Sequence, residues 1–198
     1  MNKLSRSDLW SLEEYAEQRP AFRAEVIEHK KTRQVALNDN ARLYFEDSLT
    51  IRYQIQEMLR IEKVFEAAGI EEELEAYNPL IPDGSNWKAT FMLEYADVEE
   101  RRVRLQALLG VEHKVWVQVD DPERVYAIAD EDLPRDAGEK TSSVHFMRFE
   151  LAPAMIHALK SGSALRMGVD HPAMEVDALV EDAVRDSLAN DLAAVAIN

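Results

Sequence analysis

Histidines and carboxylates are the side chains of this sequence that could support chemistry, because the chain contains no cysteine. Without a thiolate it can provide no disulfide, no cysteine nucleophile and no ligand for a cysteine-bound zinc ion or iron–sulfur cluster. None of its five histidines follows a glutamate by three residues, which excludes the Glu-x-x-His pattern of carboxylate-bridged di-iron bundles. These histidines are His29, His113, His145, His157 and His171. Histidine combined with carboxylate is a donor set that suits iron, manganese or zinc.

We predict that five polar side chains line one pocket. Glu62 falls on the apolar face of a long helix, where an unpaired carboxylate is costly unless it is paired, protonated or beside a cavity. Two further residues precede it on the helix, and two histidines lie on or at the ends of later strands, where α/β-type sheets open their sites. The ligand-binding candidates are Gln54, Glu57, Glu62, His145 and His171, of which Glu62, His145 and His171 are the candidate metal ligands.

A purely structural explanation of the same residues competes with the pocket. Arg60, Arg148 or Arg166 could neutralise Glu62, and the histidines would then pack as ordinary residues. At the corner Asp170-His171-Pro172, the aspartate would cap backbone groups while the proline fixes the bend. The sequence leaves both explanations open.

The helix that carries Glu62 is predicted to extend from about Ser48 to Ala68 and to end at Gly69. Steps of about 100° per residue place apolar residues on one broad face of it. These residues are Ile51, Ile55, Met58, Ile61 and Phe65. A short acidic helix follows over residues 71–76.

The residues before this helix predict two helices and a hairpin. Ser11 and Glu14 have the spacing of a capping box, and Pro20 suits the first turn of a second helix. Residues 34–45 alternate between apolar and polar around Asn38-Asp39-Asn40, which predicts a β-hairpin.

From Trp87 onward the chain repeats one order of elements: strand, helix, glycine, strand, then Val-Asp-x-Pro. The two units cover residues 87–129 and 143–172, separated by a polar loop. Chance similarity of two generic β-α-β units and an internal duplication sharing one sheet both explain the repeat. An acidic helix is predicted over residues 175–197.

Together these elements predict a single α+β domain over residues 1–198, with a mixed β-sheet flanked by helices. The parts are a helical N-terminal region (1–32), a hairpin with the long helix (33–82), the two units and the C-terminal helix.

Charge and composition limit the classes of partner. With 23 Lys+Arg against 38 Asp+Glu, the formal net charge is −15, which argues against nucleic acid or an anionic membrane as a main partner. The first ten residues lack the apolar run of a signal peptide, and no stretch is long enough to span a membrane. We therefore expect a cytoplasmic protein. A homodimer is the default expectation for a soluble oligomer.

Several segments in combination resemble the bacterial family known as domain of unknown function 3501 (DUF3501). They are RPAFRAEVIEHKKTRQVAL from Arg19, YNPLIP from Tyr77, SVHFMRF from Ser143 and GVDHP from Gly168, and the resemblance runs from Leu4 to about Ala178. The resemblance implies no particular activity, because none has been assigned to the family. Its genes often lie beside those of rubrerythrin-like proteins and of iron–sulfur proteins similar to heterodisulfide reductase subunits. One departure is Ala173-Met174, where the family commonly has an aromatic residue.

Two functional hypotheses follow. The resemblance suggests a non-catalytic accessory protein of a redox or oxidative-stress system, whose partner would be a rubrerythrin-like or iron–sulfur protein with a basic patch. The alternative is a metal-dependent enzyme or metal-binding protein built on the histidine and carboxylate pocket.

Overall fold

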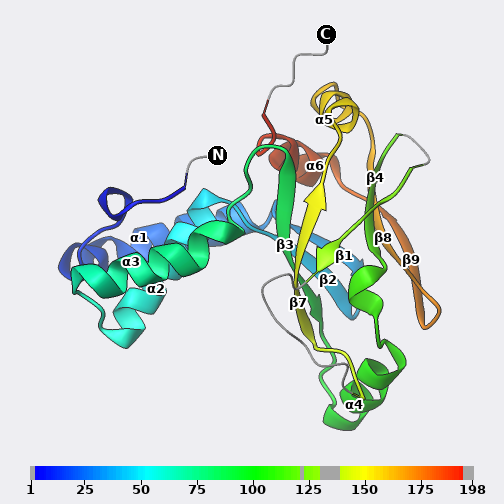
Figure 1. Ribbon diagram of the computed structural model, residues 1–198, viewed down its shortest axis with the longest axis horizontal. Coiled ribbons are helices and arrows are strands. Elements are labelled where there is room, and N and C mark those ends of the chain that lie inside the picture. Colours follow the sequence, from blue (N-terminus) through cyan, green and yellow to red (C-terminus); the bar gives the residue numbers. More distant parts are fainter. Residues whose placement is uncertain (1–2, 121–122, 130–138, 194–198) are drawn as a thin grey trace.

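The computed structural model describes residues 3–120, 123–129 and 139–193, and it confirms the α+β class. Its helices α1, α2 and α3 lie together at one side of the molecule, away from the strands (Figure 1). We call them, with two short 3-10 helices, the helical arm. Its elements are η1 (Arg6–Asp8), α1 (Leu12–Lys30), α2 (Ser48–Glu62), α3 (Ala67–Tyr77) and η2 (Asn78–Leu80). No helix among the described residues combines the length and apolar character needed to cross a membrane.

Helix α1 begins at the predicted capping box but continues through Pro20. Ser11 Oγ accepts the Glu14 N–H at 3.2 Å, and Glu14 accepts the Ser11 N–H at 2.9 Å. The prediction of two helices was wrong because Tyr15 and Phe22, on either side of the exposed proline, are both buried in one cluster. Tertiary packing on both sides of the proline outweighs its unfavourable helix propensity.

Helix α2 ends earlier than predicted. Lys63 adopts a left-handed conformation with φ of 57°, which stops the helix at Glu62. Gly69 lies inside α3 instead of ending α2, and a Cβ there would come within 2.6 Å of Val64 Cγ1. Ile61 and Phe65, predicted on the buried face, are 61% and 70% exposed.

The strands form two antiparallel sheets within the described residues, where one mixed sheet was predicted. The five-stranded sheet has the order β1 (Gln34–Asn38), β2 (Ala41–Phe45), β3 (Asn86–Leu93), β7 (Val144–Glu150) and β6 (Ile128–Ala129). The four-stranded sheet has the order β5 (Val125–Tyr126), β4 (Val115–Val119), β8 (Leu165–His171) and β9 (Met174–Leu179). The predicted hairpin is the β1–β2 pair, where the Asn38 side chain accepts the Asn40 N–H at 2.8 Å.

Helices α4 (Val98–Ala107) and α5 (Pro153–Lys160), with η3 (Val111–His113), belong to the two repeated units. Each unit gives its first strand to the five-stranded sheet and its second to the other sheet. Corresponding strands are antiparallel neighbours in both sheets, β3 with β7 and β4 with β8. A duplication would produce this pairing, although the two units do not share one sheet. Most of the predicted loop over residues 130–140 lies outside the described residues.

The C-terminal helix was predicted too early. Residues 174–179 form β9, which pairs with β8 after a tight turn at His171, and α6 (Asp182–Ala189) follows. The strand alternates, because Met174 is buried and Val176 and Ala178 are half-buried while the intervening side chains are exposed. Residues 194–197 of the predicted helix lie outside the described part.

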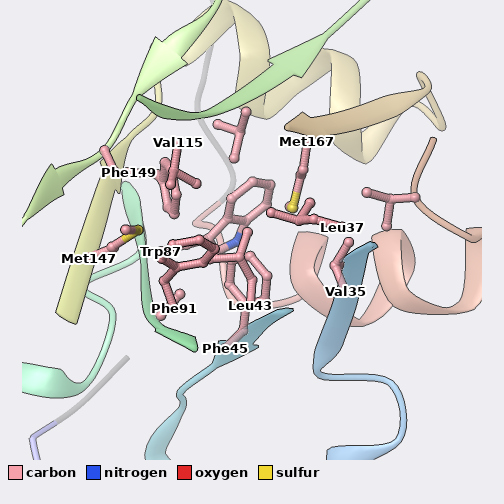
Figure 2. Close-up of a cluster of buried hydrophobic side chains, with 14 of the residues drawn as sticks. Val35, Leu37, Leu43, Phe45, Trp87, Phe91, Val115, Met147, Phe149 and Met167 are labelled. Atoms are coloured by element: carbon pink, nitrogen blue, oxygen red, sulfur yellow. The ribbon is translucent and has the colours of Figure 1, made fainter. Parts of the chain in front are cut away.

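Apolar side chains between the two sheets form the main core, shown in Figure 2. Trp87 is fully buried at its centre, and its indole N–H donates to the Leu188 carbonyl in α6 at 2.9 Å. We call the two sheets with α4, α5 and α6 the body. The arm has its own smaller apolar clusters, separate from the main core.

Candidate functional site

Glu57, a predicted pocket residue on α2, is held by side chains from α1. Its Oε1 accepts the Tyr15 hydroxyl and the Arg19 Nε–H, each at 2.7 Å, and its Oε2 accepts Arg19 Nη2 at 3.0 Å and Arg60 Nη2 at 3.2 Å. The hydrogen bond from Arg19 is the largest of the effects that lower the pKa of Glu57 to about 2, against partial burial. Glu57 is therefore an ionised clamp between α1 and α2.

The other two predicted residues of α2 are exposed. Gln54 faces solvent in the middle of the helix, and Glu62 is its last residue. The prediction that Glu62 lies on a buried face was wrong because α2 ends there, at the outer part of the arm. The three arginines proposed to neutralise it pair elsewhere: Arg60 with Glu57, Arg148 with Glu150 and Arg166 with Asp177.

His145 is a buried residue of β7, on the same side of the strand as Met147 and Phe149, as the alternation predicts. Its ring stacks on Phe91, with centroids 6.4 Å apart. Nε2 lies 3.0 Å from the Ser142 carbonyl, which can only accept, so Nε2 carries a proton in this geometry. The same nitrogen lies 2.9 Å from the Thr141 hydroxyl, which in turn donates to Glu112.

His171 closes the turn between β8 and β9. Its Nε2 donates to the Leu109 carbonyl at 3.2 Å, and its Nδ1 accepts the Ala173 N–H at 3.1 Å, an arrangement that fits the neutral ring. The structural explanation expected the preceding Asp170 to cap backbone groups, but its carboxylate forms no hydrogen bond with a backbone group of the described residues. It accepts hydrogen bonds from Trp116, Arg124 and Tyr126.

Asp170 is the centre of a network on the four-stranded sheet. Arg124 Nη1 lies 2.6 and 2.7 Å from the two Asp170 oxygens, and the same guanidinium stacks 3.9 Å above the Trp116 ring. Burial raises the pKa of Asp170, but hydrogen bonds from Tyr126 and Arg124 outweigh it and hold that pKa below its usual value. Gly168 leaves room for the indole, because a Cβ there would lie 2.4 Å from the ring of Trp116.

The five predicted residues therefore do not converge on one pocket. Three lie on α2 in the arm, whereas His145 lies in the five-stranded sheet and His171 ends a strand of the other sheet. Among the residues that the structure describes, no group of three or more histidine, aspartate or glutamate side chains could hold a metal ion. Helix α2 ends away from both sheets (Figure 1), so the fold does not bring Glu62, its last residue, together with His145 and His171.

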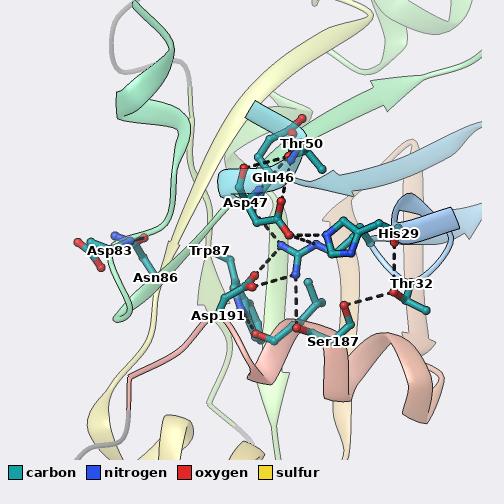
Figure 3. Close-up of polar contacts among 12 residues, drawn as sticks. His29, Thr32, Glu46, Asp47, Thr50, Asp83, Asn86, Trp87, Ser187 and Asp191 are labelled. Atoms are coloured by element: carbon teal, nitrogen blue, oxygen red, sulfur yellow. Dashed lines mark hydrogen bonds and ion pairs between the residues drawn. The ribbon is translucent and has the colours of Figure 1, made fainter. Parts of the chain in front are cut away.

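Sequence reasoning missed a buried ionic cluster that joins the arm to the body (Figure 3). Arg33 is 2% exposed and donates to both oxygens of Asp191, at 3.0 and 2.6 Å. His29 Nε2 lies 2.5 Å from Asp47, whose other oxygen caps α2 through the Thr50 N–H. Burial raises the pKa of Asp191, and the charge of Arg33 opposes that rise. Arg33 and Asp191 are 158 residues apart in the sequence, so no local pattern could have revealed their pairing.

The carboxylates at the outer end of the arm behave differently. We call residues 62–75 the acidic segment. None of its glutamates forms an ion pair with another described residue; they are Glu62, Glu66, Glu71, Glu72, Glu73 and Glu75. Partial burial, followed by the charges of Glu62 and Glu72, raises the pKa of Glu73, so these side chains add to one negative field.

Comparison with known proteins extends over nearly the whole chain. A family described as "Protein of unknown function (DUF3501)" matches residues 3–192. The crystal structure of a "novel protein of unknown function" from Burkholderia pseudomallei K96243 is 52% identical, with a TM-score of 0.91. The match covers 97% of this chain and 100% of that one. No curated protein matches the sequence.

Proposed function

The chain belongs to the DUF3501 family of proteins of unknown function, and on that premise we propose that it is a non-catalytic accessory protein that binds a redox protein through its acidic surface. The partner class is the one that the family resemblance suggests, a rubrerythrin-like or iron–sulfur protein. A chain without cysteine can dock to such a protein without competing for its cysteine-bound cluster.

The unpaired acidic segment carries this proposal. Elsewhere in the described chain, buried and half-buried carboxylates pair with arginines of the same chain: Glu57 with Arg19, Asp170 with Arg124 and Asp191 with Arg33. The acidic segment instead has six glutamates, five of them exposed, that form no ion pair with a described residue, against the single basic residue Lys63 within the segment. A concentrated negative surface attracts a partner with a basic patch, accelerates their association and makes that association sensitive to salt.

Binding kinetics with purified partners test the proposal. A rubrerythrin-like protein and an iron–sulfur protein, each from the source organism, are mixed with the chain at low and at physiological ionic strength. We expect at least one to bind, with an association rate that falls by about tenfold or more as salt is raised. Binding of neither protein at low salt, or a rate unaffected by salt, would contradict the proposal.

A matched pair of charge variants locates the effect. The double substitution Glu71→Lys and Glu72→Lys should slow association, because it reverses charge within the acidic segment. The control, Glu25→Lys with Glu175→Lys, changes the net charge equally but at exposed positions on α1 and β9. Equal slowing by both pairs would show an effect of net charge alone.

A further inference from the structure

Two large apolar side chains project into solvent where α2 gives way to α3. Ile61 is 61% exposed and Phe65 is 70% exposed, the largest exposed fraction among the exposed large apolar residues of the described chain. The left-handed Lys63 turns the chain, and Val64 packs inward close to Gly69. At this turn Val64 is half-buried against an apolar cluster of the arm, whereas Ile61 and Phe65 remain exposed to solvent.

A hollow lies beside Phe65, between the start of α1, the end of α2 and the start of α3. Its volume is about 190 Å³. Apolar side chains form most of its wall: Leu9, Trp10, Leu12, Leu59, Val64 and Ile70. An apolar cavity of about 150 Å³ is large enough to bind benzene, so this hollow can accept one aliphatic side chain.

The same end of the arm carries the unpaired glutamates of the acidic segment, and Arg6 is the one basic side chain among the described residues that line the hollow. An apolar centre with a charged rim is the usual anatomy of a protein interface. The charge of the rim selects the partner, because Lys and Arg gain from the negative field while acidic surfaces are repelled.

We propose that this end of the arm docks an amphipathic basic helix of a partner protein, which inserts one aliphatic side chain into the hollow and packs beside Phe65. This inference rests on the proposed function and assigns its contact surface. A helix fits because the arm offers helical ridges and an apolar hollow, and its described elements contain no strand edge to which a peptide strand could be added. Lys and Arg flanking the inserted side chain would face the acidic segment.

Trp10 provides a direct measure of occupancy. Trp87 and Trp116 are fully buried in the body, whereas Trp10 lines the hollow and is half-buried. Quenching of tryptophan fluorescence by acrylamide therefore reports mainly on Trp10. The probe is a synthetic helix of about 18 residues, or five turns, with Leu on one face and Lys on the other. The control peptide has Ser in place of Leu at the same charge.

We expect the Leu/Lys helix to protect Trp10 from acrylamide, and Phe65→Ser to weaken its binding by about tenfold or more. Leu179→Ser, which removes an apolar side chain of β9 that is 63% exposed, should bind like the wild type. Circular dichroism checks that each variant folds. Protection by the Ser/Lys peptide, or wild-type affinity of Phe65→Ser, would overturn the inference. So would light scattering that shows a dimer lost in Phe65→Ser, because the occupant would then be a second copy.

The redox proteins separate this inference from the proposed function. If Phe65→Ser binds them normally while Glu71→Lys with Glu72→Lys does not, the acidic segment still docks a partner and the apolar anchor is wrong. If no redox protein binds but the Leu/Lys helix protects Trp10, the docking surface is supported and the redox assignment is wrong.

Discussion

The body and the outer end of the arm treat their charged side chains in opposite ways. In the body, Asp170 accepts hydrogen bonds from three side chains, and the half-buried Arg166 pairs with the exposed Asp177 at 2.7 Å. At the end of the arm, six glutamates lack ion-pair partners among the described residues, and five of them are exposed to solvent, beside an exposed Phe65. Compensated charge stabilises a fold, whereas uncompensated charge next to apolar surface is available to another molecule.

The largest effect is expected at the junction of the two regions. Arg33→Met leaves the buried Asp191 without its partner and should lower the free energy of unfolding by about 3–5 kcal/mol. Adding Asp191→Leu should recover most of the loss, because apolar pairs can replace buried ion pairs. Urea unfolding measures both. The control Arg166→Met breaks a more exposed pair and should cost less than about 1 kcal/mol. Equal losses of unfolding free energy in Arg33→Met and Arg166→Met would show that burial does not determine how much an ion pair contributes to stability.

Gly168→Ala should produce the next largest effect, within the body. The added Cβ would lie 2.0 Å from the Val176 carbonyl oxygen and 2.4 Å from the Trp116 ring. Because a backbone atom cannot rotate away, overpacking should cost about 1–3 kcal/mol. Thermal unfolding and the near-ultraviolet signal of Trp116 measure it. An unchanged midpoint of thermal unfolding would contradict this prediction, because it would mean that the sheet accommodates the added Cβ without loss of stability.

A smaller effect depends on pH and concerns the inner part of the arm. Because Arg19 and Tyr15 hold the pKa of Glu57 at about 2, below its usual 4.5, the carboxylate stabilises the fold at pH values above about 4.5. That contribution should shrink as pH falls from 4.5 towards 2. The free energy of unfolding of Glu57→Gln should be about 1–2 kcal/mol below that of the wild type at neutral pH. This difference should disappear in acid. Glu17→Gln, at an exposed position, should show no such difference at any pH.

The smallest effect is expected at Glu62. Glu62→Gln should change stability by less than about 0.5 kcal/mol, because the side chain is exposed and makes no ion pair with a described residue. Elemental analysis of protein purified without chelator should give the same result for both forms. Stoichiometric metal that disappears in Glu62→Gln would restore the predicted pocket.

Local patterns predicted most of the elements, because capping, alternation and turn residues act over a few positions. The Ser11–Glu14 capping box and the hairpin at Asn38 are examples. Strand β9 was missed because its exposed acidic residues also fit one face of an acidic helix. The end of α2 was missed because Ile61 and Phe65 continue its apolar pattern although neither is buried.

The candidate site was harder to predict, because its pairings are not local. Asp191 meets Arg33 from 158 residues away, and Asp170 meets Arg124 from 46 residues away. The sequence indicated which side chains could do chemistry. Only the fold shows that these two aspartates form ion pairs with arginines. Ile61 and Phe65 lie beside acidic residues in the sequence. The prediction placed them on a buried face because it extended helix α2 beyond its actual end at Glu62.

A footprint of a bound partner tests the central claim most directly. Backbone amide hydrogen exchange is measured for the chain alone and with the rubrerythrin-like or iron–sulfur protein that binds it. We predict slower exchange over residues 61–75 and at the start of α1, and unchanged exchange in β8 and β9. Protection centred on the sheets of the body, with the end of the arm unaffected, would contradict the account.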